Sequence, residues 1–211
     1  MAETSTRVSA SDVVTGTGLS IAVGAVVGAA AGFLWGGVGG RIAMRVLFLT
    51  SRDEVKGLTS DDGFEIGRFS ADTIFLLILG AVLGAVIGSM YGMFRMLLVG
   101  PVWLIALGMF IMFGVGAGGG SIVSADGIDF RFLDPLWLAV GMFMFLPAAW
   151  GATVVLVVDW LLHWSGLSQD PIPGIDARPL GLIGGLVAWG GMCLLTVIGY
   201  LDLVEELSRL T

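Results

Sequence analysis

Charged residues divide the chain into five long uncharged segments. These segments cover residues 13–40, 73–94, 96–125, 135–158 and 179–201. A helix that crosses a bilayer core of about 30 Å needs about 20 apolar residues, because each residue adds about 1.5 Å to its length. Each uncharged segment is long enough for one crossing. The pattern therefore predicts five transmembrane helices, at about 17–48, 72–95, 101–118, 135–163 and 179–206.

Prolines and glycines supply the predicted boundaries. Three of the helices begin at a proline, where no amide hydrogen is needed: Pro101, Pro135 and Pro179. Asp134 directly precedes one of these prolines and is a candidate N-cap. The run Gly118–120 predicts the end of the third helix, and Pro147 predicts a kink within the fourth, because proline has no amide hydrogen to donate.

The composition indicates which solvent surrounds these helices. Hydrophobic residues make up 56% of the 211 residues and charged residues 13%, against about 25% charged residues in ordinary soluble domains. The mean hydropathy is +0.97. A soluble domain must cover itself with polar groups, so these values exclude a soluble enzyme, a nucleic-acid-binding protein and a disordered regulator. We expect an all-α, polytopic helix bundle that forms one integral membrane domain over residues 1–211, with the lipid bilayer as its first partner.

The distribution of Lys and Arg predicts an orientation. The loops 49–71 and 119–134 lie on the same side as the C-terminus, and most of the ten Lys and Arg residues belong to that side. Basic residues gather in cytoplasmic loops, which places the N-terminus outside and the C-terminus in the cytoplasm. Arginine dominates the basic residues and asparagine is absent, a bias typical of GC-rich bacterial genomes. We therefore expect a bacterial plasma membrane.

Glycine recurs at every fourth position in the first two predicted helices. The two series are Gly24, Gly28, Gly32, Gly36 and Gly40, and Gly80, Gly84, Gly88 and Gly92. Residues four apart share one face of a helix, and faces without side chains allow the close backbone contact that drives helix association in lipid. This glycine-zipper pattern predicts an antiparallel hairpin of helices 1 and 2 within one chain. The alternative is self-association into an oligomer, with a pore as one form of it.

Arg41 and Arg45 lie four residues apart at the end of the first helix. They are candidate contacts for an anion or a lipid headgroup. The alternative is that both side chains extend to the membrane surface as anchors, which their place after a long uncharged segment favours.

Other polar groups give little indication of catalysis, a cofactor or a metal. Asp126, Asp129 and Asp134 fall in one loop, where the Asp126-Gly127 pair predicts a hairpin turn. Their spacing fits no EF-hand loop, and a solvated, salt-bridged loop is the preferred interpretation, although a cation site stays open. Asp159 and His163 lie four apart and are interpreted as a pair at the membrane interface, because a tetrahedral metal site needs more ligands than the single histidine allows. We predict neither a catalytic site nor a cofactor.

Three segments carry a resemblance to other sequences. GGRIAMRVL, GFEIGRFSADTIFLL and DGIDFRFLDPLWLAV resemble segments of bacterial multi-pass membrane proteins without an assigned function. The resemblance covers roughly residues 35–165. It implies a bacterial plasma membrane and no particular activity, ligand or catalytic residue.

These observations lead to three functional hypotheses. The first is a non-enzymatic membrane protein that serves as a scaffold or partner of another membrane component. The second is a small channel or uncoupled transporter built on the glycine-faced helices. The third, the least favoured, is a lipid-acting enzyme at the membrane interface, which would use Arg41 and Arg45.

Overall fold

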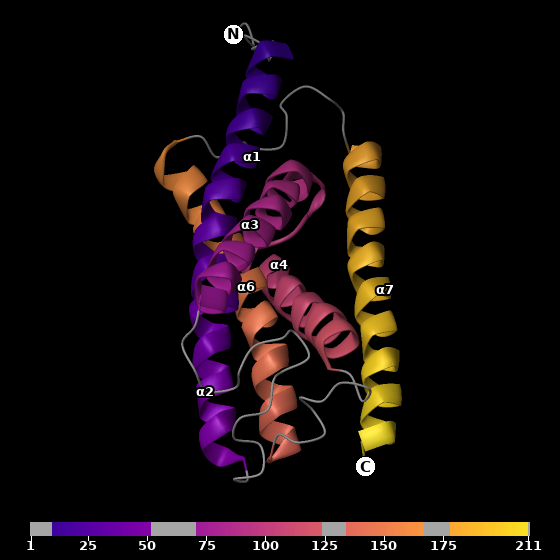
Figure 1. The fold of residues 1–211 in the computed structure, drawn as a ribbon. Coiled ribbons are helices and arrows are strands. Elements are labelled where there is room, and N and C mark those ends of the chain that lie inside the picture. The colour runs from indigo at the N-terminus through magenta and orange to yellow at the C-terminus, as the bar shows by residue number, and fades with distance from the viewer. Residues whose placement is uncertain (1–9, 52–70, 124–133, 167–177, 211) are drawn as a thin grey trace, which may run out of the picture.

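A computed structural model describes residues 10–51, 71–123, 134–166 and 178–210, and every regular element within these ranges is helical. Five helices in this part of the chain are long and apolar enough to cross a membrane. The predicted all-α class with five such helices is confirmed. The first and last described residues lie at opposite ends of the bundle, as an odd number of passes requires (Figure 1).

The first pass is one long helix made of three parts. These parts are α1 (Ala10–Ala31), the π-helical segment η1 (Gly32–Gly39) and α2 (Gly40–Thr50). Helix α3 (Ala71–Phe94) returns beside α1 and η1. A short 3₁₀ turn, η3 (Arg95–Leu97), ends the hairpin.

The third pass consists of α4 (Val102–Ile111) and a second π-helical segment, η4 (Met112–Ile122). The prediction that Gly118–120 ends this helix is wrong, because η4 continues through these glycines. Two neighbouring helices explain why. Gly118 lies against α6 and Gly120 against α7, so the packing on both sides supports a segment of low helical propensity.

The last two passes are α6 (Leu136–Trp164), which is helical through Pro147, and α7 (Arg178–Leu210). The prediction that Asp134 caps α6 is wrong. Pro135 occupies the N-cap position without a side-chain cap bond. The Asp134 amide instead donates to Ser51 Oγ at 3.0 Å, and the Ser51 hydroxyl donates to the Asp134 carbonyl at 3.4 Å. These bonds join the end of α2 to the start of α6.

Two separate apolar clusters lie along the bundle. The larger, which we call the Asp159-end core, includes Val27, Tyr91, Trp150 and Val155, from α1, α3 and α6. The smaller, the Leu47-end core, contains Leu47, Val123, Ala139, Val140 and Leu203, from α2, the residue after η4, α6 and α7. The bundle thus has two ends with cores of their own.

Candidate functional site

Helices α1 and α3 approach each other closely along a row of glycines. A Cβ added at Gly28 would lie 2.8 Å from the Cα of Gly88, and one added at Gly32 would lie 3.0 Å from the Cα of Gly84. Added Cβ atoms at Gly24 and Gly80 would likewise overlap the backbone of the opposite helix. The two backbones touch along this line, and the contact leaves no room between these helices for an ion or solute path.

The remaining glycines of the two series lie at the limits of this crossing. Gly92 faces the backbone of Ser20 and Ile21, while a Cβ at Gly36 would lie 3.7 Å from the Cα of Gly80, an ordinary contact. Gly40 approaches only the Leu76 side chain, at 3.9 Å.

The π-helical segment η1 explains where the series ends. A π-helix pairs residues i and i+5, so a spacing of four no longer keeps residues on one face. Five residues after Gly32, Gly37 turns toward α3, where a Cβ would lie 3.1 Å from the Cα of Leu77. The sequence pattern included Gly36 and Gly40 and missed Gly37 for this reason.

Helix α6 is hydrogen-bonded to the first pass through two tryptophans. Trp150 Nε1 donates to the carbonyl of Gly28 at 3.2 Å, and Trp35 Nε1 donates to Thr153 Oγ1 at 3.0 Å. The Trp150 ring also packs edge-on against Phe113, with centroids 4.8 Å apart. The sequence alone does not connect Trp150 with Gly28. The indole reaches the Gly28 carbonyl because Gly28 has no side chain in its way, and only the folded bundle brings the two residues together.

An ion pair between Arg95 and Asp159 joins η3 to α6 at the end of the bundle that contains the Asp159-end core. Asp159 is 8% exposed, and the Arg95 side chain is 22% exposed. Tyr91, one turn before Arg95 in the chain, is buried beside them in the Asp159-end core. Charges this close to apolar helices are costly unless they are paired, so this pair is a candidate functional element.

The interpretation of Asp159 and His163 as a pair is corrected by this geometry. Asp159 points into the bundle and meets Arg95, whereas His163 is exposed. One signal could have found the true partner. Arg95 and Asp159 each border an uncharged segment on the same predicted side of the membrane.

Arg41 and Arg45 have different surroundings on α2. Arg41 is half-buried, and its Nε and Nη2 atoms are buried. Arg45 is exposed, and its guanidinium carbon lies 5.4 Å from the centre of the Phe48 ring. The two side chains therefore have different environments, although the residues lie only one helical turn apart.

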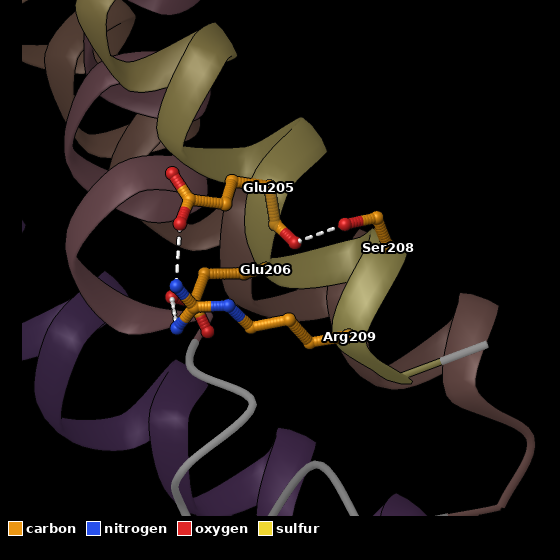
Figure 2. Close-up of polar contacts among 4 residues, drawn as sticks. All are labelled: Glu205, Glu206, Ser208 and Arg209. Carbon is orange, nitrogen blue, oxygen red and sulfur yellow. Dashed lines mark hydrogen bonds and ion pairs between the residues drawn. The ribbon is translucent and has the colours of Figure 1, made fainter.

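A hollow of about 250 Å³ lies where the end of η4 meets α7. It is lined by Gly120, Ser121, Val123, Asp202, Glu205 and Glu206. Figure 2 shows Arg209 reaching back along α7 to the carboxylates of Glu205 and Glu206, the latter at 3.4 Å, while the Ser208 hydroxyl donates to the Glu205 carbonyl. The guanidinium thus offsets part of the acidic charge.

Metal binding finds no support in the described ranges. Among residues 10–51, 71–123, 134–166 and 178–210, no group of three or more His, Cys, Asp or Glu side chains is arranged to hold a metal ion. Asp126, Asp129, the Asp126-Gly127 turn and most of the loops 49–71 and 119–134 lie outside the described residues.

No protein-family model matches the chain, and comparisons with curated proteins and with solved structures give no match.

Proposed function

We propose that this chain is a non-enzymatic, multi-pass protein of a bacterial plasma membrane that binds another membrane protein through the outward face of α7. The N-terminus lies outside and the C-terminus in the cytoplasm under this proposal. The observation that carries it is the packing of α7. In the most apolar 18-residue window of α7, 11% of the window is buried inside the protein, whereas in the corresponding window of α6 the buried share is 39%.

One side of α7 is fixed to the bundle by small residues. A Cβ added at Gly199 would lie 2.7 Å from the Val115 carbonyl oxygen, and one at Gly120 would lie 2.8 Å from the Cα of Gly199. Trp189 Nε1 adds a bond of 3.0 Å to the Val99 carbonyl. These contacts orient α7 and leave its opposite side outward, along the edge of the bundle (Figure 1).

The outward face has the features of a helix-docking surface. Gly190 and Gly191 lie in open space near its middle, with exposed Val187, Leu194 and Ile198 at helical spacing around them. Lipid chains fit around large side chains as well as small ones, whereas small residues allow a second helix to approach closely. This arrangement supports a partner helix at α7 more strongly than a passage between α1 and α3, where the backbones are in contact.

Cys193 provides a direct test, because it is the single cysteine of the chain and is exposed on α7. Membranes of the source bacterium would be treated with a reagent that alkylates the Cys193 thiol and carries a photoreactive group, which links to any neighbouring protein on illumination, and adducts would be identified by mass spectrometry. The proposal predicts one defined heterologous adduct, which Gly190→Leu abolishes. Gly141→Leu is the matched control, because Gly141 also lies in open space but belongs to α6.

Two results would contradict the proposal. One is an adduct that forms equally well in the Gly190→Leu variant, which would indicate random collision. The other is an adduct of two copies of this chain, which would show that α7 mediates self-association.

A further inference from the structure

We infer that the bundle contains one hinge layer, formed by η1, η4 and the segment of α6 around Pro147, about which the Leu47 end opens while the Asp159 end stays closed. The inference is independent of the proposed partner. It rests on two π-helical segments and a proline inside α6 that the fold brings to the same level, and on the division of the core.

The first observation is the position of the two π-helical segments. Such segments are rare, and they are frequent at functional sites. A Cβ at Gly39 in η1 would lie 2.7 Å from Leu146 Cδ2, and one at Gly118 in η4 would lie 2.8 Å from the Cα of Met144. Both segments therefore contact the same part of α6, although they are far apart in the chain.

The second observation is Pro147, which lies within that part of α6. Proline cannot donate the backbone hydrogen bond that holds a helix interior, so a helix bends more easily there. A Cβ at Gly118 would lie 3.1 Å from the Pro147 ring. The weak point of α6 thus faces Gly118, a residue without a side chain, which can adjust to a change in the direction of α6.

The third observation is the division of the core. Pro147 separates the two cores along α6. The Leu47-end core includes Ala139 and Val140, which precede Pro147, and the Asp159-end core includes Trp150 and residues after it. The Asp159 end is held by the backbone crossing of α1 and α3 and by the Arg95–Asp159 pair. At the Leu47 end, α2 and α6 are joined by the side chains of the small core and by the Ser51–Asp134 bonds, whereas η4 and α7 also touch through the backbones of Gly120 and Gly199. Motion about the layer therefore separates α2 from α6 at the Leu47 end in preference to opening the Asp159 end.

Spin-label distances in a lipid nanodisc test this inference, in a Cys193→Ala background. One pair, Leu49→Cys with Trp137→Cys, reports the Leu47 end, and a second, Met93→Cys with Trp164→Cys, reports the Asp159 end. All four side chains are exposed in the structure. We expect a broader distance distribution for the Leu49–Trp137 pair than for the Met93–Trp164 pair.

Two variants act on the hinge itself. Pro147→Ala restores an amide donor, and Gly36→Ala stiffens η1 at a position where a Cβ would make only an ordinary contact of 3.7 Å. Each is expected to narrow the Leu49–Trp137 distribution to the width of the other pair. Gly18→Ala, at a helical glycine of α1 in open space outside the layer, is the matched control and is expected to change neither distribution.

Three results would overturn the inference. Equal widths for the two pairs in the parent protein would show that no end opens in preference. Widths unchanged by both Pro147→Ala and Gly36→Ala would show that the layer is not the hinge. Equal narrowing at both ends would indicate general stiffening of the bundle.

Discussion

The two ends of the bundle are stabilised by different kinds of contact. At the Asp159 end, backbones touch at the glycine crossing, a buried carboxylate meets a guanidinium, and an indole donates to a backbone carbonyl. At the Leu47 end, apolar side chains from α2, α6 and α7 share a small core. Backbone contacts and ion pairs require one geometry, whereas apolar side chains can repack. The Asp159 end therefore fixes the arrangement of its helices, whereas at the Leu47 end α2 can shift against α6, and only η4 and α7 are fixed by backbone contact at Gly120 and Gly199.

The largest expected effect comes from filling the glycine crossing. Gly84→Leu places a side chain where a Cβ alone would lie 3.0 Å from the Cα of Gly32. The helices must separate, so we expect a loss of stability of about 3 kcal/mol or more. Thermal unfolding in detergent measures it. Gly141→Leu, in open space on α6, is the control. An equal loss of stability in both variants would show that the loss does not come from the contact of α1 with α3.

A smaller effect is expected from the ion pair. Arg95→Leu leaves the Asp159 carboxylate buried without its partner, and we expect a loss of about 2 kcal/mol, below the cost for a fully buried pair because Arg95 is partly exposed. The exchanged variant, Arg95→Asp with Asp159→Arg, is expected to recover part of this loss. Denaturation in detergent compares the three proteins. If the exchanged variant recovers none of the lost stability, then the attraction between the two charges is not what joins η3 to α6.

The smallest expected effect comes from replacing one tryptophan at each end of the bundle, of which Trp150 is hydrogen-bonded and buried and Trp137 is exposed. Trp150→Phe removes the donor to the Gly28 carbonyl and keeps an aromatic ring, so we expect a loss of about 0.6 kcal/mol, typical of such bonds between membrane helices. Trp137→Phe, at the Leu47 end where the side chain is 73% exposed, should change stability less. The same unfolding assay applies. A larger loss for Trp137→Phe would reverse the assignment of the more firmly held end.

The contacts of the candidate site were only partly accessible from the sequence. The glycine spacing identified which faces of the first two helices lack side chains, because a period of four is a local property of one helix. The partner of Asp159 was not identified, since His163 lies nearby on the same helix and Arg95 lies 64 residues away. Pairing across such a separation depends on how α3 and α6 are placed by the rest of the bundle.

The sequence by itself determined the number of helices and their all-α class. The reason is that a bilayer demands apolar segments of a minimum length with every backbone group bonded within the helix, and charges mark where such segments end. The tertiary structure alone decided the π-helical segments η1 and η4, the loss of the period of four after Gly32, and the continuation of the third helix through Gly118–120. Each of these depends on neighbours from distant parts of the chain, whose packing outweighs the weak local preference of glycine.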